Sequence, residues 1–185
     1  MFRVTYNTDR LMLIKLSNDL LDMYIDHTFD MYSNKEIMQY SGFGNVETED
    51  ELKQLLSKYL KKEDFYLWII KCKSEEKFIG DISLNVDINH NFASVACFLH
   101  YLYWGNGYMK EAMKELLFSA FAEFGLHRIE AQIHINNNRS IRFFERFGFK
   151  FEGCLRQNFL INGTFYDSKM YSLLFDEFIE MYANR

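Results

Sequence analysis

A chain of 185 residues, 49% of them hydrophobic, is long enough to bury one sizeable core, so we expect a single domain over residues 1–185. The net charge of −5 argues against a protein that binds nucleic acid through its phosphates, and no apolar run is long enough to cross a bilayer. The three cysteines form no CxxC pair, which favours buried, reduced thiols, and the N-terminus does not resemble a signal peptide. The sequence therefore predicts a soluble, cytoplasmic protein with no membrane or nucleic-acid partner.

The first third of the chain predicts one strand and then helices. Residues 10–16 alternate well enough for a strand at the edge of a sheet or beside it. Apolar positions then recur at helical spacing over residues 19–38, with an interruption near residue 33. The stretch 41–45 is a loop. Thr48 followed by Glu51 is a capping-box pattern, so a further helix should begin after Thr48 and run to about residue 62.

Three strands and a central helix are expected next. Residues 65–72 and 77–86 are rich in aromatic and β-branched side chains and predict an antiparallel hairpin. A third strand over 94–102 leads into Gly105-Asn106-Gly107, where two glycines let the backbone turn sharply and approach a ligand closely. Apolar residues form one helical stripe from Met109 to Phe124, which predicts a helix buried along one face.

The glycine turn is a candidate anion site. Backbone N–H groups at the start of a helix have no partner within it, and the helix dipole adds partial positive charge there. This arrangement can hold a phosphate, but glycines used for turn geometry alone explain the same residues equally well. A Rossmann fingerprint, a P-loop and metal-binding motifs are all missing, so no metal site is expected.

The last third predicts a parallel strand, a short helix and a hairpin. Gly125 ends the central helix, and the alternation over 127–134 favours a strand parallel to the third one through the helical crossover. Asn137 or Asn138 can cap a short helix, and Asn162-Gly163 is a strong hairpin dipeptide. The sequence therefore predicts an α+β fold.

Five segments carry, in their order and spacing, a resemblance to a known family: residues 8–16, 78–84, 103–113, 124–157 and 162–174. Together they resemble the GNAT superfamily of N-acetyltransferases, most closely the branch of ribosomal-protein-alanine N-acetyltransferases. The resemblance implies a mixed, mostly antiparallel central sheet with a splayed parallel strand pair, flanked by helices. It also implies an acetyl-CoA-dependent acyltransferase of class EC 2.3.1, and it allows a homodimer.

The activity implied is direct attack of a primary amine on acetyl-CoA, without an acyl-enzyme. The amine could be a protein N-terminus or a small molecule such as a polyamine, an amino sugar or an antibiotic. The turn over 104–109 would cradle the pyrophosphate, and the strand before it would lie along the pantetheine arm. The residues that the resemblance assigns to acetyl-CoA are Phe98, Leu99, His100, Trp104, Gly105, Asn106, Gly107, Tyr108, Met109, Asn137, Ser140 and Arg142.

Two departures from the family concern catalysis. The tyrosine that many members use as an acid falls at Phe144, which has no proton to give, so Ser140 is the candidate for protonating the leaving thiolate. The glutamate that assists the amine in some relatives falls at Phe159. The general base is therefore unassigned. Its candidates are Asp167, His100 and Glu152, each with a structural alternative.

Phe144 and Phe159 also suggest an alternative, a non-catalytic acyl-CoA-binding module, and a structural protein without any cofactor is a third hypothesis. The acceptor remains open because its pocket is expected between residues 19–62 and the C-terminal hairpin. Aromatic residues there suggest a partly apolar or cation–π lining, although core packing explains them equally well: Phe29, Tyr32, Tyr40, Phe43 and Phe159.

Overall fold

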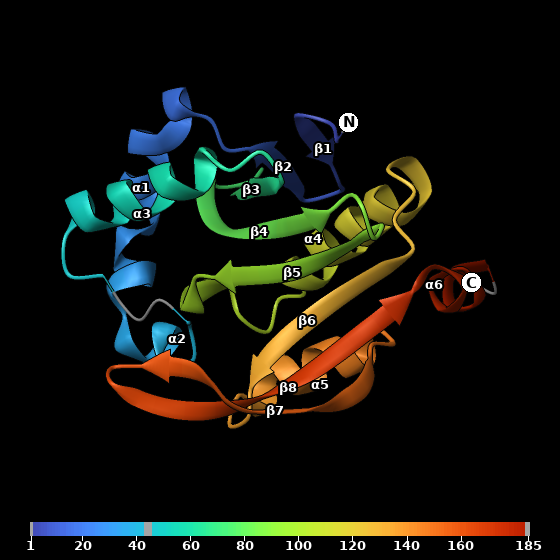
Figure 1. Ribbon diagram of the computed structural model, residues 1–185. Helices are drawn as coiled ribbons and strands as arrows, with labels where there is room; N and C mark the ends of the chain where they lie inside the picture. Colours follow the sequence, from blue (N-terminus) through green and yellow to red (C-terminus); the bar gives the residue numbers. More distant parts are fainter. Residues whose placement is uncertain (1, 43–45, 184–185) are drawn as a thin grey trace.

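The computed structural model describes residues 2–42 and 46–183, which form an eight-stranded sheet with helices on both faces (Figure 1). The spatial order of the strands is β1-β2-β3-β4-β5-β6-β8-β7. Their bounds are β1 Thr5–Asn7, β2 Leu11–Lys15, β3 Phe65–Cys72, β4 Lys77–Asp87, β5 Phe92–Leu99, β6 Arg128–His134, β7 Lys150–Ile161 and β8 Thr164–Leu174. The helices are α1 Asn18–Ser33, α2 Lys35–Met38, α3 Glu49–Leu60, α4 Tyr108–Phe118, α5 Asn138–Arg146 and α6 Phe175–Ala183.

The mixed α+β fold predicted from the sequence is confirmed. Adjacent strands are antiparallel except for β5 and β6, which are parallel. The hydroxyl of Thr48 accepts the N–H of Glu51 at 3.2 Å and so begins α3, as the capping-box pattern predicts. Asn162 and Gly163 both have positive φ, at 49° and 78°, which is the backbone of a tight turn between β7 and β8.

The observed elements differ from the predicted ones in four places. The short strand β1 was not predicted, and it pairs only with β2 at the edge of the sheet. The strand expected over 94–102 is shifted to 92–99, because residues 101–103 form a 3₁₀ turn. The central helix ends in a π turn, Ser119–Glu123. Cys154 is exposed rather than buried, because β7 lies at the open edge of the sheet. The loop expected at 41–45 lies partly outside the described residues.

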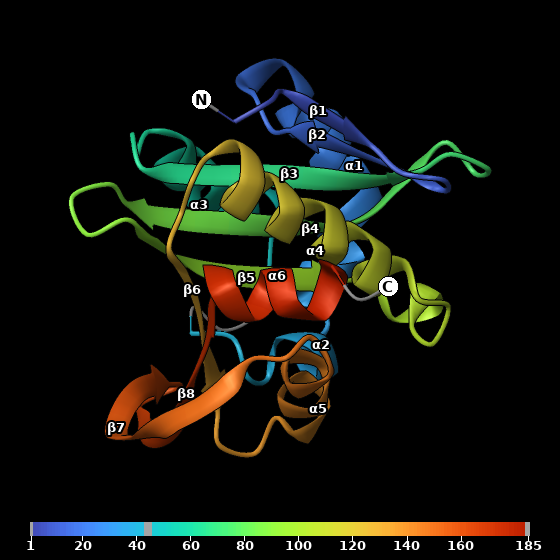
Figure 2. The ribbon, with the colours of Figure 1, turned by 90° about the vertical axis from the view of Figure 1, so that its right-hand side faces the viewer.

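Each face of the sheet has its own hydrophobic core. Helices α1, α2 and α3 cover one face, and α4, α5 and α6 lie on the other (Figures 1 and 2). Neighbours on β3 alternate between the two cores: Trp68 packs with the α4 side and Ile69 with the α1 side. Both side chains are fully buried, so β3 is covered on both faces. No helix within residues 2–42 and 46–183 is long and apolar enough to cross a membrane.

The parallel strands β5 and β6 separate soon after they pair. Their register contains three pairs, of which the last joins Ser94 to Glu130. Beyond this point β5 stays paired with β4 as far as Leu99. Gly80 on β4 allows this close pairing, because a Cβ added there would lie 2.2 Å from the carbonyl oxygen of Phe98. The sheet is therefore split between residues 95–99 of β5 and the end of β6, as the resemblance implied.

A buried polar cluster ties α1 to β4 beside this split. The hydroxyls of Tyr24 and Tyr32 both donate to one carboxylate oxygen of Asp81, each at 2.5 Å. Asp81 is 2% exposed. Burial raises the pKa of Asp81 to about 6, while the two tyrosine hydrogen bonds act in the opposite direction.

Candidate active site

A cleft of about 890 Å³ opens where β5 and β6 separate. Residues 95–99 of β5 form one wall, the turn before α4 lies at one end, and the end of β6 and one face of α5 form the other wall. Ten of the twelve residues that the sequence assigned to acetyl-CoA line this cleft: Phe98, Leu99, Trp104, Gly105, Gly107, Tyr108, Met109, Asn137, Ser140 and Arg142. Residues from two segments far apart in the sequence, 98–109 and 137–142, therefore line one cleft.

The charged side chains along this cleft are all cationic. They are Lys110, Arg139, Arg142 and Arg146. Within the described residues no aspartate or glutamate lines the cleft, although the chain as a whole carries a net charge of −5. A cleft of one charge sign attracts a ligand of the opposite sign, so this one favours an anionic ligand.

The start of α4 presents backbone amides to the cleft. Gly107 is the N-cap residue of α4, with φ of 79°, and no side chain caps the first helical turn. The left-handed φ explains why glycine suits this position. Because the amides of this turn have no side-chain cap and the helix dipole is positive at this end, a phosphate fits here.

Arg10, in the turn between β1 and β2, holds the glycine turn in place. Its Nη1 donates to the carbonyl oxygen of Asn106 at 3.0 Å, and its Nε pairs with the carboxylate of Glu111 at 2.7 Å. The hydroxyl of Thr8 donates to the other oxygen of Glu111 at 2.5 Å. Because these contacts come from the sheet, the turn has a defined position before any ligand binds.

The α5 side of the cleft begins at Asn137. The side-chain oxygen of Asn137 accepts the N–H of Ser140 at 3.1 Å, so Asn137 rather than Asn138 caps the helix. The amide nitrogen of Asn137 can then donate to a ligand. Ser140 and Phe144 are one helical turn apart and both line the cleft. Phe144, 5% exposed, packs edge-on against Phe149, so this part of the cleft wall is hydrocarbon.

Two predicted residues, His100 and Asn106, do not line the cleft. The Nε2 of His100 lies 2.7 Å from the carboxylate of Asp30 on α1, and its Nδ1 accepts the N–H of Leu102. His100 therefore faces α1. The amide of Asn106 donates to the carbonyl oxygen of Trp104 at 3.3 Å, so it stabilises the turn.

The three residues considered for the general base are all engaged elsewhere. His100 is paired with Asp30. Asp167 accepts the backbone N–H of Gln157 at 2.8 Å, and Glu152 pairs with Arg128 at 2.8 Å. None of the three lines the cleft. Each of these three side chains therefore has the structural contacts that the sequence analysis gave as the alternative to a role as general base.

Among the cleft residues that were not found from the sequence, two have distinctive surroundings. The guanidinium of Arg139 on α5 lies over the ring of Trp104, 3.3 Å from its centroid, and so connects the α5 wall to the turn before α4. Burial and the carboxylate of Asp81 raise the pKa of the Cys97 thiol to about 12. Cys97 therefore stays protonated at neutral pH and is a poor nucleophile. Neither residue belongs to a recognisable motif, because both roles arise only when distant segments pack together.

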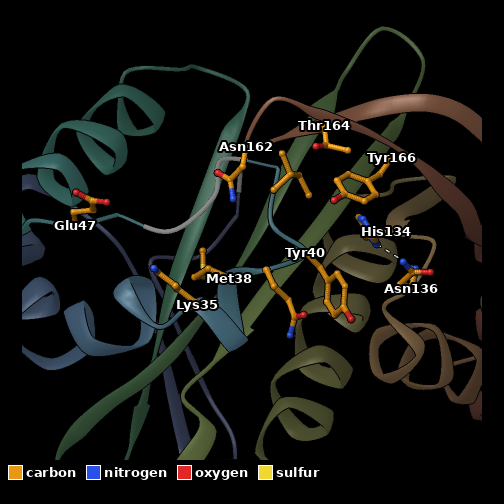
Figure 3. Close-up of a pocket in the computed structure, with 11 residues that line it drawn as sticks. Lys35, Met38, Tyr40, Glu47, His134, Asn136, Asn162, Thr164 and Tyr166 are labelled. Atoms are coloured by element: carbon orange, nitrogen blue, oxygen red, sulfur yellow. Dashed lines mark hydrogen bonds between the residues drawn. The ribbon is translucent and has the colours of Figure 1, made fainter.

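A second pocket, of about 610 Å³, adjoins the cleft (Figure 3). Tyr40 and His134 line both spaces. The other residues that line the pocket come from α2, the segment after it, Asn136 and the β7–β8 hairpin: Lys35, Met38, Gln39, Glu47, Asn136, Ile161, Asn162, Thr164 and Tyr166. These are the two regions in which the sequence analysis expected an acceptor. Of the five aromatic residues named there, Tyr40 lines the pocket and Phe43 lies outside the described residues.

Comparisons with known proteins identify the family of the chain. The model of the acetyltransferase (GNAT) domain matches residues 10–150. The uncharacterized N-acetyltransferase YoaA of Bacillus subtilis (strain 168) is 28% identical over 171 residues, which cover 90% of this chain and 94% of that protein.

Two solved structures share the fold. A GCN5-related N-acetyltransferase from Brucella melitensis has a TM-score of 0.84 at 24% identity and covers 94% of this chain and 79% of its own. Spermidine N-acetyltransferase from Vibrio cholerae, in complex with CoA and spermine, has a TM-score of 0.78 at 23% identity. The match covers 93% of this chain and 99% of that one. Since the family model spans most of the sequence, the chain belongs to the GNAT family of N-acetyltransferases, enzymes that use acetyl-CoA as cosubstrate.

Proposed function

We propose that this protein transfers the acetyl group of acetyl-CoA, bound in the cationic cleft, to a primary amine that enters through the second pocket. The observation that carries the proposal is the junction of the two spaces at Tyr40 and His134, beside the split between β5 and β6. An anionic cosubstrate and an amine can then approach one another from different sides. Because the amine enters through the second pocket, it also stays away from the cationic side chains of the cleft.

The cleft offers matching groups for the pyrophosphate and for the pantetheine arm of acetyl-CoA. The amides at the start of α4 would hold the pyrophosphate, with Arg139 and Arg142 adding positive charge beside it. Among the described strands, β5 has no ladder partner on its β6 side after Ser94, so its backbone can pair with the pantetheine arm as an added strand would. The amide nitrogen of Asn137 would donate to the same arm.

The chemistry proposed is a direct transfer. The nitrogen of a neutral amine attacks the thioester carbon, the C–S bond breaks, and the extra proton on nitrogen leaves to water. The hydroxyl of Ser140, which lines the cleft one turn before Phe144, would donate its proton to the leaving thiolate and take one from water in its place, so that the proton lost by the amine is balanced. Cys97 would not carry the acetyl group, since its thiol stays protonated at neutral pH.

The non-catalytic alternative rested on Phe144 and Phe159, and the comparisons do not support it. Phe144 lines the cleft as a hydrocarbon surface, which removes one proton donor but leaves the binding groups in place. The order of the five sequence segments favours the branch of ribosomal-protein-alanine N-acetyltransferases as the enzyme's place within the family. A protein N-terminus is one of the acceptors that this branch would predict.

The test is release of free thiol from acetyl-CoA against a panel of amines, with each product identified by mass spectrometry. The panel contains short peptides with a free N-terminal Ala or Ser, spermidine, amino sugars and aminoglycosides, and reactions without the amine are the control. We expect amine-dependent thiol release with one class. Calorimetry that detects no acetyl-CoA binding would overturn the proposal.

A further inference from the structure

His134 lies in the wall between the cleft and the second pocket. It is the last residue of β6 and is 3% exposed. Its ring packs between Tyr40 and Tyr166, with ring centroids 4.9 and 4.8 Å away (Figure 3). A residue in this position can contact an acceptor at the point where its amine meets the thioester.

Hydrogen bonding fixes which nitrogen of His134 carries the proton. The backbone N–H of Asn136 donates to Nδ1 at 3.1 Å. A ring nitrogen that accepts a hydrogen bond carries no hydrogen, so the neutral ring has its N–H at Nε2. Burial lowers the pKa of His134, which keeps the ring neutral at neutral pH.

The Nε2 of His134 makes no hydrogen bond to a residue in the described part of the chain. Every buried side-chain nitrogen and oxygen atom in that part does have a partner. An unpartnered Nε2 must therefore be accessible from the adjoining space. It presents a hydrogen-bond donor and calls for an oxygen on the ligand, not for an N–H. Nε2 could accept a proton only in the other tautomer of the ring, in which Nδ1 carries the hydrogen and the hydrogen bond from Asn136 is lost.

The second pocket has a balanced charge. Its charged side chains, among the residues that the structure describes, are one ammonium, Lys35, and one carboxylate, Glu47. A polyamine carries several positive charges and gains little from such a lining. Besides His134, the remaining polar side chains carry amides or hydroxyls: Gln39, Asn136, Asn162, Thr164, Tyr40 and Tyr166. Groups of this kind, which both donate and accept, match the peptide group.

We infer that the acceptor is an α-aminoacyl group, the N-terminal residue of a peptide or an amino acid amide, whose carbonyl oxygen accepts the Nε2–H of His134. This inference rests on the proposed function and narrows it. Hydrogen bonding to the carbonyl beside the amine places the amine nitrogen at the junction with the cleft. His134 is therefore a specificity residue that binds the carbonyl oxygen of the acceptor. It takes no part in the reaction of the amine nitrogen.

The first experiment compares acceptors with the wild-type protein. Alaninamide and 2-aminobutane share a skeleton, but only alaninamide has a carbonyl oxygen beside the amine. We expect alaninamide and an N-terminal alanine peptide to be acetylated with a kcat/KM at least about tenfold above that of 2-aminobutane at equal neutral amine, the value of one hydrogen bond. Spermidine should also be a poor acceptor. Preference for 2-aminobutane, spermidine or an amino sugar would overturn the inference.

The second experiment uses two variants at one position. His134→Phe keeps the ring between Tyr40 and Tyr166 but removes the donor, whereas His134→Gln places an amide N–H near the position of Nε2. We expect His134→Phe to lower the ratio of kcat/KM for alaninamide to that for 2-aminobutane about tenfold, and His134→Gln to recover most of this loss. Because His134 also lines the cleft, the dissociation constant of acetyl-CoA is measured in both variants, and the ratio between the two acceptors removes its effect.

The outcomes separate this inference from the proposed function. An equal loss with alaninamide and 2-aminobutane would mean that His134 only supports the fold, and would overturn the inference. If acetyl-CoA binds and spermidine alone is acetylated, the inference fails while the proposed function stands. If acetyl-CoA binds but no α-aminoacyl acceptor is acetylated, the inference likewise fails while the proposed function stands. If the wild-type protein does not bind acetyl-CoA, the proposed function fails as well. Circular dichroism checks that both variants fold, and the wild-type comparison needs no variant.

Discussion

The cleft and the second pocket share Tyr40 and His134, yet they are built in different ways. The cleft depends on backbone geometry: a left-handed glycine at the start of α4, an uncapped helical turn and a strand edge without a ladder partner. The second pocket depends on side chains that α2 and the β7–β8 hairpin bring together from far apart in the sequence. A space built from backbone geometry leaves a local sequence pattern, whereas a space lined by side chains from distant segments does not.

The largest expected effect tests the backbone side of this comparison. Replacing Gly107 by Asp places a negative charge where the phosphates approach, and we expect acetyl-CoA affinity to fall by more than about a hundredfold. Isothermal titration calorimetry measures this loss. Unchanged affinity would show that the phosphates bind elsewhere.

Gly107→Ala is the matched control. A Cβ at this position would lie 3.6 Å from an Arg10 nitrogen, an ordinary contact, so only the strain of the left-handed φ remains. That strain costs about 1 to 2 kcal/mol of stability. The Ala variant should therefore bind acetyl-CoA within a few-fold of wild type, because most of the Asp effect comes from its charge.

The sequence predicted the fold and most of the residues that line the glycine-turn side of the cleft, for identifiable reasons. Glycine spacing, the Thr48 cap and the Asn162-Gly163 turn each act within a few residues, so they can be recognised without knowing tertiary contacts. Arg139 and His134 could not be recognised in this way. Arg139 matters because its helix faces Trp104, and His134 because Tyr40 and Tyr166 surround it. These are consequences of packing.

The next prediction separates the shape of the cleft from its chemistry. Asp81 is buried on β4, the strand that pairs with β5. Its pKa is raised from 3.8 to about 6, so its ionisation opposes folding. The stability contribution is fully present below the unfolded-state pKa of 3.8 and is lost as pH rises through about 6. We expect the stability of Asp81→Asn relative to wild type to increase by roughly 2 kcal/mol between about pH 4.5 and about pH 7.5.

Urea unfolding at these two pH values measures the difference. Acetyl-CoA affinity of folded Asp81→Asn should stay near that of wild type, because Asp81 does not line the cleft. A difference in stability that does not change with pH would contradict the assignment of a buried, titrating carboxyl group to this position.

A smaller effect is expected on the chemical step. If the hydroxyl of Ser140 protonates the thiolate, Ser140→Ala should lower kcat about tenfold or more and leave acetyl-CoA affinity almost unchanged. Phe144 lies one turn away on the same face of α5, so Phe144→Tyr should restore part of the lost rate when it is added to Ser140→Ala. Steady-state kinetics with one acceptor measures both. A double variant no faster than Ser140→Ala would count against proton donation from this face.

The smallest expected effect concerns the contact that joins α5 to the turn before α4. Arg139→Met keeps a side chain over Trp104 but removes the charge, and we expect acetyl-CoA to dissociate about fivefold more readily, as for one partly exposed phosphate contact. Added salt should weaken binding less in this variant than in wild type, because one cation of the cleft is gone. Arg146→Met is the matched control, since Arg146 also lines the cleft but does not stack on Trp104. If both variants lose the same affinity, the cleft attracts its ligand through summed charge alone. A larger loss at Arg139 would mean that the bridge from α5 to Trp104 also positions the ligand, a role that depends on packing as the second pocket does.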